Sequence, residues 1–281
     1  MKDLALLIST NFETFSKRYF DKKPAGLYEP LMYTMESGGK RIRPLLALLS
    51  CELFNGDINK VLLPAYGLEL FHTFTLLHDD IMDNSDLRRG KPTVHKKYGI
   101  NAGILSGDLM MVLALKLASE IDGEVQRDLY NLMIQTSIEL YEGQQFDVDF
   151  EDRNDVKQEE YLKMIELKTA VLLGCSLKLG AIIAGATELQ QNKIYEFGRN
   201  IGLSFQIQDD YLDTFGDTKV GKKIGGDILN NKKTLLLISA LQKGTSEQKA
   251  VLEKWIATSN DDDAKIKAVT NLYVETGAMQ Y

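Results

Sequence analysis

The sequence predicts an all-α fold, a single large helical bundle and one domain from residue 1 to residue 281, on three observations. All five prolines lie at or before Pro92, so residues 93–281 contain none, and proline is excluded from helix interiors. Apolar residues recur at spacings of three and four, which is the helical period. The chain shows neither the alternation and turn signals of strands nor a linker or change in composition that would mark a domain boundary.

The predicted helices follow this periodicity and occupy most of the chain. Their approximate ranges are 3–20, 28–37, 42–54, 63–83, 101–120, 124–148, 157–184, 188–214, 233–243, 246–258 and 262–276. The four longest carry apolar residues over much of their surface, which is typical of helices at the centre of a bundle. Longer loops are predicted at three places: 84–100, 149–156 and 214–232.

Composition and charge exclude several classes of protein. The formal net charge of −7 and the sequence pI of about 5.2 argue against a general nucleic-acid binder. Cys51 and Cys175 lack CxxC spacing and are interpreted as reduced core thiols. No apolar run approaches the roughly 20 residues of a membrane span, and the N-terminal apolar stretch is too short for a signal peptide. The sequence therefore predicts a cytoplasmic protein that is not integral to a membrane.

Two acidic motifs of the form DDxxD lie at residues 79–83 and 209–213, near the ends of predicted helices. Positions i, i+1 and i+4 place three carboxylates within one helical turn, where they repel one another. The C-terminal end of a helix also disfavours acids, because it carries partial negative charge. Nothing in the local sequence is expected to neutralise the clusters. One cluster alone is also explained by a solvated helix end, but two matched clusters predict an external cation. Ligand oxygens without Cys or His favour Mg²⁺ and a phosphorylated ligand that it bridges.

Two basic segments complement the acidic motifs. GGKRIRP at 38–44 places three cations beside a glycine pair, and DLRRGKP at 86–92 follows the first acidic motif directly. A basic helix start explains the first segment less well than a phosphate site does, because cations oppose the dipole at that end. Lys168-Thr169 and Lys232-Lys233-Thr234, taken alone, are interpreted as surface lysines beside a small polar residue.

The three histidines are individually interpreted as structural. Glu69 and His72 have the ExxH spacing of di-iron bundles, but such sites need two ExxH pairs and the chain has one. His78 is placed to hydrogen-bond the first acidic motif, and His95 is expected in the following loop. No catalytic triad or P-loop is present. Acids for Mg²⁺ and bases for phosphate in one bundle suit a departing diphosphate, with an apolar cavity for the carbocation that it leaves.

Six ordered motifs resemble those of the trans-isoprenyl diphosphate synthases, also called the polyprenyl synthetase family, over roughly residues 38–235. They are GGKRIRP at 38–44, HTFTLLHDDIMD at 72–83, DLRRGKPTVH at 86–95, LKT at 167–169, FQIQDDYLD at 205–213 and GKKIGGD at 221–227. The resemblance implies an all-α bundle around a central cavity, the isoprenoid synthase type of fold, and a homodimer. It implies head-to-tail condensation of isopentenyl diphosphate with a dimethylallyl, geranyl or farnesyl diphosphate.

The resemblance also assigns roles to individual residues. It implies several Mg²⁺ ions on the allylic diphosphate, bound by Asp79, Asp80, Asp83, Asp209 and Asp213. The allylic diphosphate would contact Arg88, Lys168, Lys222 and Lys232. Isopentenyl diphosphate would contact Lys40, Arg43, His72 and Arg89. Thr169 and Gln206 would lie beside the reacting carbons and stabilise the cation. The catalytic set is thus Asp79, Asp80, Lys168, Thr169, Gln206 and Asp209, and the released diphosphate is the usual candidate for the final proton acceptor.

Product length is predicted from the residues just before the first acidic motif. By resemblance, the large Phe74 and the small Thr75 indicate C20 geranylgeranyl diphosphate, with C15 farnesyl diphosphate as the near alternative. Ideal helix geometry does not support this independently, because it turns Phe74 nearly opposite the carboxylate face. The sequence departs from the family at Asn231, where a glycine is usual, and at its C-terminus, where family members continue with a further helix. We therefore expect a truncated C-terminus.

Two rival interpretations remain at this stage. A class I terpene cyclase shares the fold, but its second metal motif is usually of an Asn/Ser/Glu type. A non-catalytic subunit of a heteromeric synthase would be expected to have lost acidic motifs, and both are intact here.

Overall fold

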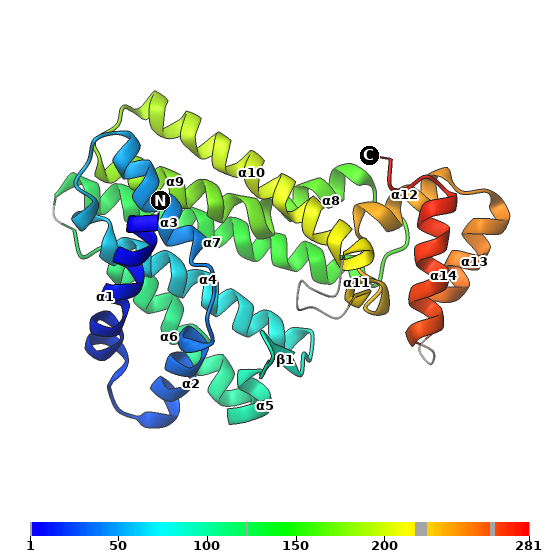
Figure 1. Cartoon of the computed structure of the whole chain (residues 1–281), viewed down its shortest axis with the longest axis horizontal. Helices are drawn as coiled ribbons and strands as arrows, with labels where there is room; N and C mark the ends of the chain where they lie inside the picture. The colour runs from blue at the N-terminus through cyan, green and yellow to red at the C-terminus, as the bar shows by residue number, and fades with distance from the viewer. Residues whose placement is uncertain (1, 122, 217–223, 259–261, 281) are drawn as a thin grey trace. The chain divides into compact units, whose positions relative to one another are not determined.

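The computed structural model describes residues 2–121, 123–216, 224–258 and 262–280, and it consists almost entirely of helices (Figure 1). The chain divides into two compact units. Unit 1 comprises residues 1–137 and 172–198, and unit 2 comprises residues 138–171 and 199–281. The prediction of mostly helical structure is confirmed, and each unit is described by itself.

Unit 1 is built around helix α4, which packs most extensively against α6. Its helices are α1 (Lys2–Phe20), α2 (Ala25–Glu36), α3 (Ile42–Leu53), η1 (Ile58–Lys60), α4 (Leu62–Met82), α5 (Val94–Tyr98) and α6 (Ile100–Ala118), with parts of α7 (Glu124–Glu151), α9 (Val171–Ile183) and α10 (Glu188–Phe215). Twelve residues of α4 are buried, including Phe71 and Phe74. Gly67 permits close packing, because a Cβ there would lie 2.9 Å from the Ala114 carbonyl oxygen of α6.

A short hairpin in unit 1 corrects the prediction that the chain has no strands. β1 (Leu87–Arg88) pairs antiparallel with β2 (Lys91–Pro92), inside the segment 84–100 that was expected to be a loop. The two turn residues, Arg89 and Gly90, both have positive φ, of 53° and 75°, as a two-residue hairpin turn of the I′ kind requires. The strands are too short for the alternation that marks a strand in sequence.

Unit 2 has two apolar clusters around the remaining helices. These are the rest of α7 and α10, α8 (Gln158–Ile165), the π-helical segment η2 (Glu166–Ala170), α11 (Gly226–Leu229), α12 (Leu235–Lys243), α13 (Ser246–Ile256) and α14 (Asp262–Glu275). One cluster includes Tyr161 and Ile165 of α8 together with Ile238 of α12. The other joins α12, α13 and α14, which include Leu237, Leu252 and Tyr273.

The π-helical segment η2 interrupts what was predicted as one helix over 157–184. Two glycines explain how the widened turn is accommodated. A Cβ on Gly143 of α7 would overlap the backbone nitrogen of Lys168, and a Cβ on Gly202 of α10 would lie 2.5 Å from the Ala170 Cα. Single π turns inside α-helices are frequent at functional sites, and this one carries the Lys168-Thr169 pair.

One helix also corrects the prediction about membrane spans. Within the described residues, α6 is long and apolar enough to cross a membrane, and 39% of its apolar stretch is buried. Such a helix is weak support for a membrane segment, because the core helix of a soluble protein passes the same test. The extensive packing of α6 against α4 accounts for the apolar residues on the buried face of α6, such as Met110 and Leu117.

Candidate functional site

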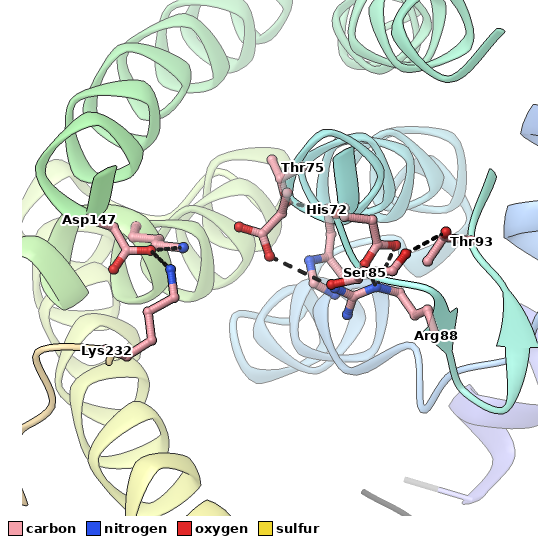
Figure 2. A network of polar contacts seen from close by, with 10 residues as sticks. His72, Thr75, Ser85, Arg88, Thr93, Asp147 and Lys232 are labelled. Atoms are coloured by element: carbon pink, nitrogen blue, oxygen red, sulfur yellow. Dashed lines mark hydrogen bonds and ion pairs between the residues drawn. The ribbon is translucent and has the colours of Figure 1, made fainter. Parts of the chain in front are cut away.

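The first acidic motif ends α4 in unit 1, and Arg88 of the hairpin binds it (Figure 2). The Arg88 Nε atom lies 2.9 and 2.8 Å from the two carboxylate oxygens of Asp80, and one Nη lies 2.8 Å from Asp80 and 3.8 Å from Asp79. The prediction that nothing nearby neutralises this motif was therefore wrong. Burial lowers the pKa of Arg88, but the hydrogen bond and the charge of Asp80 raise it, and the pKa lies above its usual value.

The rest of the first motif is more exposed. Asp79 is half-buried, and Asp83 is exposed at the end of α4, where its N–H donates to the Asp79 carbonyl. The hairpin is tied to this end of α4, because the Thr93 hydroxyl donates to the Ser85 carbonyl at 2.7 Å (Figure 2). The hairpin, α2 and α4 together line a pocket in unit 1 that includes Leu76, Asp80, Arg88, Arg89 and Thr93. The pocket thus combines guanidinium groups with apolar lining.

A second basic group in unit 1 gathers Arg43, Arg89 and His72. The guanidinium of Arg89 lies against Gly39, where a Cβ would be 2.9 Å from Nη1; this contact explains why a glycine suits position 39. Burial and the charge of Arg89 lower the pKa of Arg43 to about 10, despite the opposite effect of Glu69. Burial and both arginines lower the pKa of His72 well below its usual range. This arrangement favours an anion. Lys40 is exposed in the loop before α3.

The other two histidines differ from their predicted positions. His78 does not point at the acidic motif: its Nε2 lies 3.3 Å from the Ile104 carbonyl oxygen and 3.9 Å from Asp108, both on α6. His95 lies in α5 rather than in a loop, and it is buried. Neither ring nitrogen of His95 has a hydrogen-bond partner within the described part of the chain.

Phe74 and Thr75 lie on α4, one turn before the first acidic motif. Phe74 is buried, with its ring edge-to-face against Phe71 at 5.0 Å and against His78 at 5.7 Å. Thr75 is half-buried and donates its hydroxyl hydrogen to the His72 carbonyl. The large side chain is therefore held in place by aromatic packing.

The second acidic motif lies near the end of α10 in unit 2 and has different partners. Asp210 is buried and accepts hydrogen bonds from the Tyr161 hydroxyl at 2.6 Å and from the Gln206 amide at 2.8 Å. The pKa of Asp210 is raised to about 6, chiefly by burial and also by the charges of Asp209 and Asp213, while the two hydrogen bonds lower it. Asp213 accepts the backbone N–H of Asp227 at 2.9 Å. Asp209 is half-buried.

Two predicted lysines of unit 2 meet on an aspartate that was not predicted. The Asp147 carboxylate on α7 accepts hydrogen bonds from Lys168 at 2.7 Å and from Lys232 at 3.2 Å (Figure 2). Lys232 also contacts Glu151. Burial raises the pKa of Asp147, but the charges of Lys168 and Lys232 lower it, and the pKa lies below its usual value. The interpretation of the two lysines as surface residues was therefore wrong. Asp147 carried no sequence signal, because its partners are 21 and 85 positions away.

Thr169 and Gln206, which the resemblance assigned to the same site, contact each other. The Thr169 hydroxyl donates to the Gln206 side-chain oxygen at 2.9 Å. Thr234 has a structural role instead, because its hydroxyl accepts the Leu237 N–H and caps α12. Lys222 lies outside the described residues.

The carboxylates present fit Mg²⁺ by their chemistry. Asp79 and Asp83 occupy positions i and i+4 at the accessible end of α4, and they offer oxygen alone, the ligand that Mg²⁺ prefers. No three metal-binding side chains converge on one point among the residues that the structure describes. The motif is thus a partial set of ligands, which is usual for Mg²⁺ because the ion keeps water or substrate oxygens.

Comparison with known proteins decides the family. The polyprenyl synthetase family model matches residues 24–273. The chain belongs to the polyprenyl synthetase family. A geranylgeranyl diphosphate synthase of Methanosarcina mazei is 38% identical over 92% of this chain and 79% of its own length. A geranylfarnesyl diphosphate synthase of Natronomonas pharaonis is 35% identical over 96% of this chain and 83% of its own length. A crystal structure of geranylgeranyl pyrophosphate synthase has a TM-score of 0.93 and 45% identity, covering 99% of this chain and 86% of that one.

Membership of the polyprenyl synthetase family confirms three predictions. The fold is the all-α isoprenoid synthase fold. The protein is an enzyme, a prenyltransferase of the short-chain type. The terpene cyclase and the non-catalytic subunit are not favoured, because the relatives are named as synthases of prenyl diphosphates.

Proposed function

We propose that this polyprenyl synthetase condenses isopentenyl diphosphate with an allylic diphosphate and releases C20 geranylgeranyl diphosphate. The relatives named as geranylgeranyl diphosphate synthases support the product. The observation that carries the substrate class is the basic group of unit 1. Burial and the like charge of Arg89 lower the pKa of Arg43 although Glu69 opposes this, and the buried Arg43 Nε has no partner within the described residues. A diphosphate would add negative charge and hydrogen-bond acceptors to this group.

In unit 1, Lys40, Arg43, His72 and Arg89 are proposed to bind isopentenyl diphosphate. Guanidinium groups bind phosphate oxygens in a bidentate manner, and a neutral His72 adds one directional hydrogen bond. Arg88 has a different task. It is proposed to move part of its hydrogen bonding from Asp80 to the allylic diphosphate, which frees the carboxylate as that substrate and its cations arrive.

In unit 2, Lys168 and Lys232 are proposed to bind the allylic diphosphate, with Lys222 as a further cation. Asp147 would keep the two ammonium groups side by side until a diphosphate replaces it as their acceptor. Thr169 and Gln206 are proposed to lie beside the reacting carbons, where polar oxygens stabilise positive charge.

Mg²⁺ is the proposed cofactor, held by Asp79, Asp80 and Asp83 of the first motif and by Asp209 and Asp213 of the second. When bound, Mg²⁺ would neutralise the diphosphate and make it a better leaving group. The protein's own contribution is to position the allylic carbon, to keep water from the cation and to leave the released diphosphate as the proton acceptor. A dry apolar cavity is required for these tasks.

The product length is proposed to be limited by Phe74. Its ring is fixed by Phe71 and His78, so it cannot easily turn aside for a longer chain. With Phe74→Ala, we expect products longer than C20, while Thr75→Ser should leave the product unchanged. Products of unchanged length with Phe74→Ala would show that another residue ends elongation.

The decisive experiment is product analysis. Purified protein with Mg²⁺ and isopentenyl diphosphate is offered C5, C10 or C15 allylic diphosphates, and the products are separated by chromatography. We expect C20 as the main product and none in EDTA. A main product of C15 or C25 would correct the chain length, and no product from any primer would refute the proposed function.

A homodimer is also proposed, on the outward face of α6. Ile104, Leu105 and Val112 are 42%, 58% and 61% exposed, and contiguous exposed apolar surface often marks an interface. Light scattering should give twice the chain mass for the wild type and a smaller mass for Leu105→Asp with Val112→Asp. Leu189→Asp on α10, another exposed apolar position, is the control and should leave the mass unchanged. We further propose that the enzyme acts in the cytoplasm.

A further inference from the structure

Four side chains of unit 2 form one continuous hydrogen-bonded chain. The Tyr161 hydroxyl of α8 donates to one oxygen of Asp210, and the Gln206 amide nitrogen donates to the other. The Gln206 oxygen then accepts the hydrogen of the Thr169 hydroxyl, at 2.9 Å. Asp210 and Gln206 are four residues apart on α10, one helical turn, and Thr169 lies on the π-helical segment η2. The chain therefore connects the buried aspartate of the second acidic motif to Thr169.

The direction of every bond in this chain follows from Asp210. A carboxylate oxygen can only accept a hydrogen bond, so the Gln206 side chain must turn its NH₂ group toward it. That choice leaves the Gln206 oxygen facing Thr169. Because this oxygen also can only accept, the single hydrogen of the Thr169 hydroxyl must point at Gln206. Free lone pairs of the Thr169 oxygen are then directed away from Gln206.

We propose that Asp210 is a positioning residue that sets the orientation of the Thr169 hydroxyl, so that its oxygen, not its hydrogen, faces the substrate. The inference rests on the proposed function, in which the allylic diphosphate ionises to a carbocation beside Thr169. An oxygen lone pair stabilises that cation, whereas a hydroxyl hydrogen would repel it. Dipoles that are already oriented need no rearrangement as charge develops, which is where such groups contribute most to rate.

Burial at one end of the hydrogen-bonded chain supports a fixed orientation. Asp210 is 7% and Tyr161 is 1% exposed, so water does not compete for the hydrogen bond between them, whereas Gln206 and Thr169 are half-buried. The three carboxylates of the second motif are also not equivalent. Asp210 points into the protein toward Tyr161, whereas Asp209, the proposed metal ligand of this pair, is half-buried. One motif therefore serves two purposes, with its middle carboxylate acting through Gln206.

Replacing the Asp210 carboxylate by an amide, and then the Gln206 amide by a carboxylate, tests this role. In Asp210→Asn, the amide oxygen keeps the hydrogen bond of the Tyr161 hydroxyl, which donates to no other group within the described residues. The amide nitrogen then faces Gln206, whose side chain turns over and points its NH₂ group at Thr169. We expect kcat to fall roughly 10- to 100-fold, with KM for both substrates within about threefold of wild type. Adding Gln206→Glu restores an acceptor next to Thr169, so the double variant should regain most of the lost kcat. If it is no faster than Asp210→Asn alone, the proposal is wrong.

A double-mutant cycle with Thr169→Val separates this role from a general effect of charge. If Asp210 acts through the Thr169 hydroxyl, Asp210→Asn should have little further effect on kcat once that hydroxyl is absent. Full additivity of the two changes would contradict the proposal. Thermal melting of each variant confirms that it is folded before kinetics are compared.

Binding of a cation analogue provides a readout without turnover. The probes are an analogue of geranyl diphosphate with a protonated amine nitrogen at carbon 3 and its uncharged carbon counterpart, measured by calorimetry with Mg²⁺. Asp210→Asn should weaken the amine analogue roughly tenfold and leave the carbon analogue unchanged. Equal loss for both, or for neither, would overturn the proposal. Since binding needs no reaction, a wild type without prenyltransferase activity would refute the proposed function separately.

Discussion

The two DDxxD motifs share spacing and burial but differ in what binds their middle carboxylates. Asp80 is 5% and Asp210 is 7% exposed. Asp80 accepts hydrogen bonds from the guanidinium of Arg88, a cation on a neighbouring hairpin. Asp210 accepts hydrogen bonds from two neutral groups, the Tyr161 hydroxyl and the Gln206 amide. A motif thus specifies where carboxylates lie, while the surrounding elements specify how each one is used.

The partners of the two middle carboxylates differ in whether a substrate can replace them. Arg88 is half-buried and offers a fork of donors, so a diphosphate can take over some of its hydrogen bonds. Tyr161 is buried in an apolar cluster and cannot turn elsewhere, so Asp210 keeps its partners. Asp147 extends the comparison, because it is a buried carboxylate with two cationic partners. We therefore expect removal of the carboxylate charge to lower the free energy of unfolding most at Asp147 and less at Asp80, and to raise it at Asp210.

The largest effect is expected on turnover at the first motif. Asp80→Ala removes a proposed Mg²⁺ ligand and the partner of Arg88, so kcat should fall at least about 100-fold. Asp86→Ala is the matched control, because Asp86 is an exposed aspartate of the same segment that pairs with Lys96 at 3.0 Å. It should stay within about threefold of wild type. A rate near wild type for Asp80→Ala would remove Asp80 from the metal site.

The second expected effect is on the stability of unit 2 at Asp147. Asp147→Asn leaves two half-buried ammonium groups without their shared anion, so the free energy of unfolding should fall by roughly 2–3 kcal/mol. Asp149→Asn on the same helix is the control, because Asp149 is exposed and contacts only the Gln145 amide in the structure's hydrogen bonds. Denaturant unfolding measures both variants. Equal stability of the two would show that the lysines need no anion before substrate binds.

A smaller loss is expected at Asp80 itself. Asp80→Asn keeps the shape of the side chain but leaves the Arg88 guanidinium with a neutral acceptor. Burial raises the pKa of Asp80 despite the hydrogen bonds from Arg88, so relief of that burial cost largely offsets the loss of the ion pair. The free energy of unfolding should therefore fall by less than about 1 kcal/mol. The measurement is thermal melting in EDTA at pH 7, so that divalent cations do not contribute. A loss as large as that expected for Asp147→Asn would show that the pair with Arg88 outweighs the cost of burying Asp80.

Asp210→Asn should raise the free energy of unfolding, by an amount that depends on pH. Its folded-state pKa of about 6 exceeds the value near 3.9 of an unfolded chain. The associated stabilisation is present below about pH 4 and is lost as pH rises through 6. Asp210→Asn cannot ionise, so in EDTA it should be more stable than wild type by roughly 1–3 kcal/mol at pH 7, and the difference should vanish near pH 4. A variant less stable than wild type at pH 7 would contradict the comparison.

Particular residues show how far sequence could anticipate the fold and the site. The long helices were predicted within a few residues, because their apolar periodicity extends over many turns. The Arg89-Gly90 hairpin was missed, because two-residue strands carry no periodicity. The π-helical segment was missed, because it depends on Gly143 and Gly202, which lie 25 and 32 positions from the residues they pack against, Lys168 and Ala170. Glu69, Asp147 and Tyr161 were not assigned to the site, because a buried polar residue looks like any other until its partners are known.

The sequence by itself determined the family, because the motifs and their order are visible along the chain. It also determined which chemical groups each acidic motif presents, because a helix places positions i, i+1 and i+4 within one turn. The sequence likewise placed each acidic motif near the end of a long helix, although no three metal-binding side chains converge among the described residues. Only the tertiary structure decided that Arg88 neutralises the first motif, that His78 turns toward α6 and that Asp210 faces Tyr161. These are contacts between elements that chain spacing does not encode, because burial and partner direction arise only when the helices pack.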